Sequence, residues 1–265
     1  MKRQIVLVLE IVGRWFYRFI AYIGEISLFL VDVVKNIFSK PFYVKELLDA
    51  LVEIGYKSLP IVVTITFFSG MIMTLNVGKS MDSIVKGTSQ YVGSGILFVM
   101  IKEFGPVLTA IALISRVGAG ITAQISTMKA TEQVDALKIM SISPIKFLVV
   151  PKVVAMVVMM PFLSSIAVFA GVVGGMVMAV FYLDQSIFTY IDKVLFVLRY
   201  RDIIDMIVKS VVLGFLVGIV SSFYGMKSEG GAKGVGVYTT KSVVASIIII
   251  IIADYFVTYI LMSIR

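Results

Sequence analysis

The sequence predicts an all-α membrane protein whose helices cross a bilayer several times. Of its 265 residues, 59% are hydrophobic and only 15% are charged, and the mean hydropathy is +1.03. Soluble domains are about 45–50% apolar and about 25% charged, so no soluble fold of this size could bury so much apolar surface. The apolar residues also gather in runs long enough for membrane-spanning helices, with charged segments between them.

Residues 1–58 form the first predicted unit, an amphipathic helical region that lies in the membrane interface. Basic residues alternate with aromatic ones here, and Glu25 and Asp32 interrupt the longest uncharged piece. That piece is shorter than the roughly 20 residues that a span requires. Lysine and arginine would extend toward water while the aromatic rings sit at headgroup depth. The alternative is one poor spanning helix over residues 19–34.

Residues 59–265 form the second predicted unit, a domain of five transmembrane helices. Its charge-poor runs cover residues 59–77, 92–115, 153–183, 210–226 and 242–264. The third run is longer than a perpendicular span, and Pro161 with the glycines at 171–175 predicts a long, tilted, broken or partly re-entrant helix. We expect a small extramembrane helix over 184–209 and a glycine-rich loop over 227–241.

The distribution of basic residues predicts the topology. The N-terminal region, the 116–152 connector and the 227–241 loop hold 16 of the 24 Lys and Arg residues. Because the side richer in Lys and Arg is usually cytoplasmic, these three segments are expected in the cytoplasm and the C-terminus outside. The same bias accounts for the net charge of +8 without a nucleic-acid partner.

Charged residues inside the predicted spans are the first candidate site. Lys102 and Glu103 lie within the second span, immediately before Gly105-Pro106, and Asp254 lies within the fifth. Charge inside a membrane is costly, usually paired and often lines a polar pathway. The alternatives are a helix break at the membrane surface for the Lys-Glu pair, and a hydrogen bond to a neighbouring helix for Asp254.

The connector is the second candidate site. Apolar residues recur at helical spacing along it, and polar residues occupy the other side. The apolar positions are Ile121, Ile125, Met128, Val134 and Leu137. Such a helix either packs on its own bundle or fits a groove on a partner protein, and amphipathicity does not distinguish the two.

Two small-residue motifs predict close helix packing. Gly171-xxx-Gly175 and Gly214-xxx-Gly218 each place two glycines on one helix face. Such pairs let helix backbones approach each other. We expect this packing within one subunit, with a contact between two copies as the alternative.

The composition argues against an enzyme. The chain has no Cys and no His, which excludes disulfides, thiolate and imidazole metal sites, and Cys or His catalysis. No cofactor or metal is expected. Val77-Gly78-Lys79-Ser80 resembles the end of a phosphate-binding loop, but Met73 occupies the position of the required first glycine. The chain therefore has no predicted nucleotide site of its own.

The stretch from Lys102 to Pro151 carries a family resemblance. It reads Glu-Phe-Gly-Pro-Val-Leu-Thr-Ala from residue 103, Ser-Arg-Val-Gly-Ala-Gly-Ile-Thr-Ala-Gln from residue 115, and Met-Lys-Ala-Thr-Glu-Gln-Val-Asp-Ala-Leu from residue 128. Together with Gly-Gly-Ala-Lys-Gly-Val-Gly-Val-Tyr-Thr-Thr from residue 230, it resembles the MlaE/YrbE permeases of ABC transporters. The resemblance covers roughly residues 40 to 262.

The resemblance implies a fold, an activity and partners. The fold is an N-terminal interfacial helix plus five transmembrane helices, with a cytoplasmic coupling helix at about residues 119–138. The activity is phospholipid movement by an integral-membrane homodimer, between the inner membrane and a periplasmic MCE-domain carrier (MlaD-like). A separate ABC ATPase subunit (MlaF-like) supplies the energy, so this chain would be non-catalytic. The expected location is the bacterial inner membrane, with the plastid inner envelope as the alternative.

The resemblance also assigns candidate residues. Lys102, Glu103, Leu75 and Phe98 would line the lipid pocket. The residues that would contact the ATPase are Gln124, Met128, Lys129, Glu132, Gln133 and Asp135. Gln124 stands where the family pattern has Glu and Ser126 where it has Gly, so this chain lacks that carboxylate. Lys102 keeps a positive charge but lacks the bidentate fork of the Arg found in relatives.

Two other function classes remain open at the level of sequence. A membrane-embedded lipid-modifying enzyme would need a cluster of polar residues at headgroup depth, which the spans do not supply. A passive scaffold or channel would need no ATP, and a channel would show several spans with polar faces. Dependence on ATP separates the permease from both.

Overall fold

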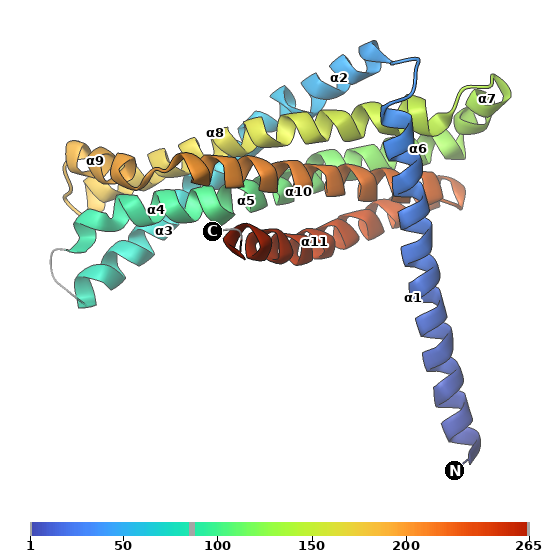
Figure 1. The fold of residues 1–265 in the computed structure, drawn as a ribbon, viewed down its shortest axis with the longest axis horizontal. Coiled ribbons are helices and arrows are strands. Elements are labelled where there is room, and N and C mark those ends of the chain that lie inside the picture. The colour runs from blue at the N-terminus through green and yellow to red at the C-terminus, as the bar shows by residue number, and fades with distance from the viewer. Residues whose placement is uncertain (1, 85–87, 264–265) are drawn as a thin grey trace.

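The structure is a computed structural model that describes residues 2–84 and 88–263, and all regular structure in them is helical (Figure 1). Five stretches of these residues are long and apolar enough to cross a membrane: Val44–Met81, Val92–Ala130, Ile145–Tyr182, Tyr200–Lys227 and Gly231–Ser263. They run side by side as an elongated bundle. The prediction of an all-α membrane protein with five spans is confirmed.

The five stretches are made of helices that continue into one another. The first stretch consists of α2 (Val44–Ile54), the 3₁₀ turn η1 (Tyr56–Ser58) and most of α3 (Leu59–Ile84). The second consists of α4 (Val92–Val99), the π-helical turn η3 (Met100–Phe104), α5 (Gly105–Leu113), the π-helical turn η4 (Ile114–Gly118) and α6 (Ala119–Ala130). The third consists of the π-helical turn η5 (Ile145–Val149) and α8 (Val150–Tyr182). The fourth is α10 (Tyr200–Lys227) and the fifth begins and ends with α11 (Gly231–Ser263). Between them lie the short elements η2 (Thr88–Tyr91), α7 (Gln133–Ile139) and α9 (Ile187–Val197).

The N-terminal helix α1 (Lys2–Ile37) lies across the bundle rather than along it (Figure 1). It is amphipathic, and it is not among the stretches apolar enough to span in the described part of the chain. Its second half packs against α10. The Tyr22 hydroxyl donates a hydrogen bond of 2.7 Å to the Tyr224 hydroxyl, and the Phe29 and Phe223 rings meet edge to face. This orientation fits the interfacial prediction and disfavours a span over residues 19–34.

Glycines set the closest helix contacts, between α3 and α8. A Cβ atom on Gly70 would lie 1.9 Å from the carbonyl oxygen of Gly171, and one on Gly174 would lie 2.1 Å from the carbonyl oxygen of Phe67. No side chain fits at such distances, so the two backbones touch directly. Gly218 on α10 likewise faces Val153 on α8. The glycine motifs therefore serve packing within this chain, as predicted.

The long helix predicted over residues 153–183 is found, because α8 is continuous through Pro161, and the broken and re-entrant alternatives are wrong. Two predicted boundaries are also wrong. The fourth span begins at Tyr200, so residues 200–209 belong to α10 and only α9 is a separate short helix. The fifth span begins at Gly231, which leaves a turn at residues 228–230 in place of a long loop. α11 packs against α6 and α10, for example where the Thr122 hydroxyl donates to that of Ser242, and it is helical from Gly231 despite the low helix propensity of its glycines.

The predicted connector helix over residues 119–138 is divided in two. Its first part, α6, continues the second span without interruption and buries Ile121 and Ile125 against α10 and α11. The chain then turns at Glu132, which has a left-handed backbone (φ +61°), and α7 follows. The division between residues 1–58 and 59–265 stays a prediction, since α2 runs through η1 into α3.

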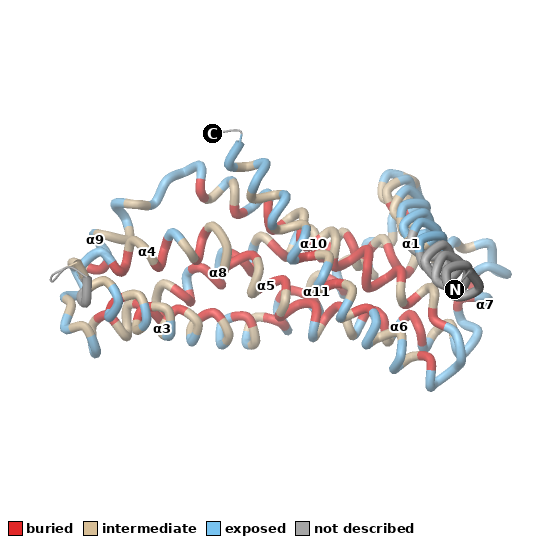
Figure 2. The backbone as a smooth tube through the Cα atoms, turned by 90° about the horizontal axis from the view of Figure 1, so that it is seen from below, coloured by how far each residue is buried: buried red, intermediate tan, exposed pale blue. Residues whose placement is uncertain are grey.

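Burial is uneven around the bundle. The buried residues concentrate where α5, α6, α8 and α10 meet (Figure 2). α11 is the least covered of the five spans, with only 11% of its most apolar window buried, compared with 56% for the second span. Its outer face exposes Ile251, Ile252, Tyr255, Phe256 and Tyr259. α11 therefore leaves an apolar face for lipid or for another protein chain.

Candidate functional site

A π-helical turn carries the two charged residues predicted in the second span. Residues Met100–Phe104 form η3, directly before Gly105 and Pro106. Proline has no N–H to donate, and a wider π turn is one way for a helix to absorb that defect. The helix continues into α5, so the alternative of a helix break at this point is wrong. Lys102 and Glu103 are thereby held inside the bundle, against α10.

Lys102 is held by two carboxylates of α10. Its ammonium lies 2.6 Å from Asp202 Oδ1 and 2.6 Å from Asp205 Oδ2. The side chains are largely shielded, with exposed fractions of 17% for Lys102, 6% for Asp202 and 19% for Asp205. Lys102 is therefore already neutralised by this chain's own carboxylates.

Lys209 forms the second half of the network. Its ammonium lies 2.7 Å from Glu103 Oε2 and 2.9 Å from Asp254 Oδ1, and it donates a hydrogen bond of 2.8 Å to the carbonyl oxygen of Lys102. Only 3% of the Lys209 side chain is exposed. The Thr258 hydroxyl donates to Glu103 Oε1 at 3.3 Å. η3, α10 and α11 thus meet at the buried ammonium of Lys209. Asp254 does bond a neighbouring helix, as the alternative prediction states, but it also shares Lys209 with Glu103.

The network holds two cations and four carboxylates, which we call the charged network: Lys102, Glu103, Asp202, Asp205, Lys209 and Asp254. A single charge in a low-dielectric region is very unfavourable, and pairing with hydrogen bonds offsets that cost. Removing either lysine takes a shared cation from two carboxylates at once, so each lysine stabilises the position of both of its partners. Such a network can reorganise if a new ion enters or the helices shift.

Four members of the charged network, Lys102, Glu103, Asp205 and Lys209, line a pocket between η3, α10 and α11. The pocket has a volume of about 160 Å³. Its lining residues are Phe98, Val99, Lys102, Glu103, Asp205, Lys209, Thr258, Leu261 and Met262. Phe98, Lys102 and Glu103, three of the four predicted pocket residues, therefore share this pocket. Leu75 lies on α3 and does not line it.

Sequence reasoning missed most of the partners. The charges of residues 184–209 predict a separate extramembrane helix for Asp202, Asp205 and Lys209, and no motif in the sequence points to Thr258. Asp202, Asp205 and Lys209 are spaced by three and then four residues, which places these three side chains on one face of a helix. That periodicity is the signal that joins them to the fourth span. Which ions they pair with depends on tertiary packing and cannot be derived from spacing.

The predicted ATPase-contact residues divide between exposed and packed positions. Glu132 and Gln133 are exposed at the turn between α6 and α7. Lys129 is tied to α10, because its ammonium donates a hydrogen bond of 2.9 Å to the carbonyl oxygen of Met226. Met128 packs against the small cluster of Val134, Leu137 and Leu148 under α7.

The other two predicted contacts have partners within the chain. Gln124 is exposed and its amide oxygen accepts a hydrogen bond from Lys152. Asp135 is exposed on α7, 2.7 Å from Lys138. The Lys138 ammonium lowers the pKa of the Asp135 carboxyl, so this residue carries its negative charge at neutral pH. The tip of the connector therefore presents Glu132, Gln133 and a charged Asp135 outward.

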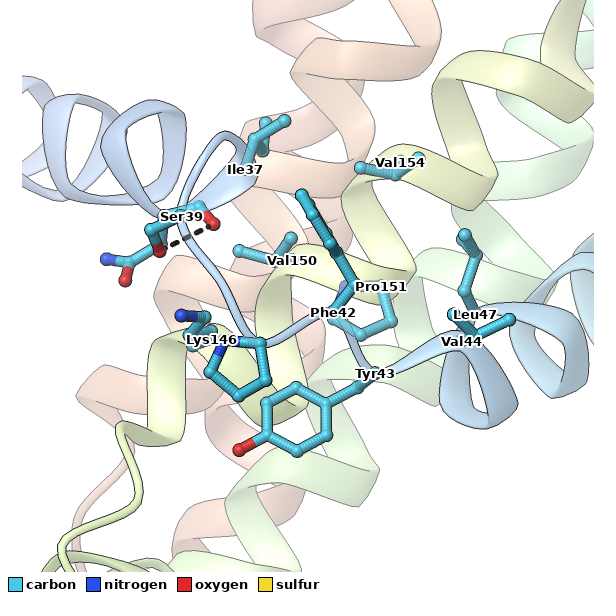
Figure 3. Close-up of a pocket in the computed structure, with 12 residues that line it drawn as sticks. Ile37, Ser39, Phe42, Tyr43, Val44, Leu47, Lys146, Val150, Pro151 and Val154 are labelled. Atoms are coloured by element: carbon cyan, nitrogen blue, oxygen red, sulfur yellow. Dashed lines mark hydrogen bonds between the residues drawn. The ribbon is translucent and has the colours of Figure 1, made fainter.

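A larger, nearly apolar pocket lies at the joint between α1 and α2 (Figure 3). It has a volume of about 260 Å³ and is formed where the 38–43 linker crosses the start of α8. Phe42 and Tyr43 come from the linker, and Val150 and Val154 from α8. Lys146 lies at the edge and donates to the carbonyl oxygen of Lys40. None of the predicted site residues lines it.

Comparison with known proteins gives the family. A family model described as Permease MlaE matches residues 47–260, most of the chain. The chain belongs to the MlaE permease family. The match includes the charged network and the whole connector. The resemblance drawn from residues 102–151 is confirmed, and this MlaE-family chain is a membrane permease subunit.

Curated relatives agree with this membership. A probable ABC transporter permease protein of Rickettsia felis is 38% identical over 247 residues, which cover 93% of this chain and 95% of that protein. A probable ABC transporter permease of Synechocystis is 32% identical, over 93% of this MlaE-family chain and 92% of its own length. The protein TRIGALACTOSYLDIACYLGLYCEROL 1, chloroplastic, of Arabidopsis thaliana is 30% identical over 84% of this chain and 63% of its own.

Proposed function

We propose that this MlaE-family permease moves phospholipids between the bacterial inner membrane and a periplasmic MCE-type carrier. A separate ATPase subunit supplies the energy. The observation that carries the proposal is the pocket between η3, α10 and α11, which combines an apolar lining with an internal charged network. A phospholipid has the same division, with apolar chains and a charged headgroup. The name of the Arabidopsis relative contains a glycerolipid, which also supports a lipid substrate.

The pocket suits a lipid better than a small ion. Phe98, Leu261 and Met262 offer apolar contacts, and methionine adapts its shape to flexible chains. Because Lys102 already contacts Asp202 and Asp205, it is not a free phosphate-binding cation in this conformation. We infer that a lipid phosphate competes with these carboxylates for Lys102. The exchange would make lipid binding weak and reversible, as transport requires.

A second copy of the chain fits the exposed face of α11. That helix has the least covered apolar surface of the five spans, yet it carries Asp254 and Thr258 into the charged network. A homodimer that pairs the α11 faces would close the open side of the pocket with apolar residues such as Tyr255 and Tyr259. The lipid would then lie between the two copies.

The connector gives the ATPase a place to act. α6 is the direct continuation of the helix that contains η3, so a push at the α6–α7 turn is transmitted along one helix toward Lys102 and Glu103. Glu132 and Gln133 are exposed at that turn. We propose that closure of the ATPase subunits shifts this helix against α10 and opens or closes the pocket.

Reconstitution tests this function directly. The chain is incorporated into liposomes with the ATPase subunit of its own host and a fluorescent phospholipid, and transfer to a purified MCE-domain carrier is measured. We expect transfer that requires ATP and stops when the ATPase is catalytically inactive. Transfer without ATP would support a passive channel or scaffold. A change in the mass of the lipid would support a lipid-modifying enzyme.

A further inference from the structure

A small polar pocket separate from the charged network lies between α2, the η4–α6 junction and α8. Its volume is about 70 Å³. The residues that line it are Ala50, Glu53, Ile54, Arg116, Val117, Gly120, Ile121, Gln124 and Lys152. Arg116, Lys152, Glu53 and Gln124 supply its polar groups. No residue of the charged network takes part, so the two sites differ in location and composition.

The two cations of this pocket donate their hydrogen bonds to neutral groups, and the Glu53 carboxylate attracts the Lys152 ammonium without an ion-pair contact. Arg116 donates from Nη1 to the Ser58 hydroxyl at 2.6 Å and to the carbonyl oxygen of Glu53 at 3.2 Å. Lys152 donates to the amide oxygen of Gln124. Within residues 2–84 and 88–263, the ion pairs of the structure include neither Arg116 nor Lys152. One carboxylate, that of Glu53, also lines the pocket, which leaves it with a formal excess of one positive charge.

Both cations keep N–H groups for a further acceptor. The Arg116 guanidinium has five N–H donors and uses two of them in the contacts above. The Lys152 ammonium has three N–H donors and uses one. Phosphate oxygens match this arrangement, because an arginine fork binds them in two places and lysine adds a point charge. The pocket is thus suited to a phosphate-type anion that meets Arg116 and Lys152 together.

The depth of the pocket favours a lipid as the source of that anion. Arg116 directly follows the uncharged run that ends at Ser115, and Lys152 directly precedes the run that begins at Val153. Ser58, the partner of Arg116, directly precedes the run that begins at Leu59. Three uncharged runs therefore end at one level of the bundle, and we take this level as headgroup depth. Basic pockets between helices at this depth bind anionic lipid headgroups.

We propose that Arg116 and Lys152 bind the phosphate of an anionic phospholipid in the leaflet on the connector side. This lipid is a resident of the subunit and is distinct from a transported lipid in the pocket at Lys102. It would bridge α2, α6 and α8, which otherwise meet here through neutral hydrogen bonds. The inference goes beyond the proposed transport, because binding of this resident lipid does not depend on which substrate the permease moves.

Native mass spectrometry of the purified full-length chain tests the site. Phosphatidylglycerol is added to delipidated protein, with phosphatidylcholine as the neutral comparison and inorganic phosphate in excess as the free anion. We expect at least one phosphatidylglycerol per chain to be retained in preference to phosphatidylcholine. Lys152→Gln should weaken this retention about fivefold, the effect of one basic residue near an anionic surface. Arg116 is left intact because its bonds to Ser58 and Glu53 also hold α2.

Two further variants make the result specific. Gln124→Glu keeps the size of the side chain but pairs Lys152 with a carboxylate, so it should also weaken retention. Lys57→Gln removes an exposed charge at the same depth but outside the pocket, and it should leave retention unchanged. Equal retention by wild type, Lys152→Gln and Gln124→Glu would overturn the proposal. So would an equal loss in Lys57→Gln, or displacement of the lipid by inorganic phosphate.

Discussion

The ammonium of Lys209 on α10 lies 2.7 Å from the carboxylate of Glu103 on η3, and the lysine side chain is buried (3% exposed) while that of Glu103 is partly exposed (38%). Glu103 follows Lys102, whose own partners Asp202 and Asp205 lie two turns and one turn, respectively, before Lys209. Two adjacent residues on one helix thus bind oppositely charged residues on one face of another. These ion pairs between η3 and α10 fix the register of the second span against α10.

Removal of Lys209 should destabilise the permease strongly. In Lys209→Met, Glu103 and Asp254 lose their shared cation and remain in an apolar bundle, and breaking a buried pair in this way costs about 3–5 kcal/mol. Thermal unfolding in detergent or nanodiscs measures the loss. Lys79→Met, an exposed lysine on α3, is the control and should unfold like wild type. Adding Glu103→Gln to Lys209→Met should recover part of the stability, and no recovery would argue against the pairing.

Reversal of charge at Lys102 should reduce lipid binding. Lys102→Glu places three carboxylates together with Asp202 and Asp205, which repels a lipid phosphate and loosens the pocket wall. Mass spectrometry of lipid copurified with the protein should show less phospholipid per chain than in wild type. Lys102→Arg preserves the charge and serves as the control. Unchanged lipid content in Lys102→Glu would remove this residue from the lipid pocket.

The contact between α3 and α8 should not tolerate a side chain at Gly70. A Cβ atom there would lie 1.9 Å from the Gly171 carbonyl oxygen, so Gly70→Ala forces the two helices apart. Overpacking of this kind costs about 1–3 kcal/mol, which thermal unfolding detects. Gly95→Ala on α4 is the matched control, because no atom lies within 4 Å of its added Cβ. Equal stability of the two variants would contradict the backbone contact.

These contacts show how far the sequence alone predicts the structure. Apolar runs locate the five spans because a membrane requires roughly 20 consecutive apolar residues in a helix. The same criterion failed at residues 200–209, since charges that would be costly in isolation are tolerated when Lys102 pairs with Asp202 and Asp205. Lys102 and Glu103 could be singled out as functional candidates by their charge. Their partners lie about 100 residues away, so only the packed bundle reveals them.

The sequence around the glycines after Lys227 does not predict where α11 begins. The segment after Lys227 contains four glycines before Val237 and is typical of a loop. Gly230 (φ +89°) and Gly231 (φ +59°) do form a turn, but the chain is helical from Gly231 onward. The low helix propensity of glycine therefore mispredicts where α11 begins. Pro161 is likewise accommodated inside α8.

The turn between α6 and α7 should be required for assembly with the ATPase but not for folding. In the double variant Glu132→Gly and Gln133→Ala, glycine accepts the left-handed backbone at residue 132, so the change removes side chains without strain. Copurification with the ATPase subunit should fall sharply while thermal unfolding and lipid content stay unchanged. The alanine variant of Ser186 and Asp192, exposed residues at α9, is the control and should assemble normally. If the Glu132–Gln133 variant assembles like wild type, the ATPase contacts another surface. In that case, force would reach Lys102 and Glu103 by a route other than the continuous helix from α6 to η3.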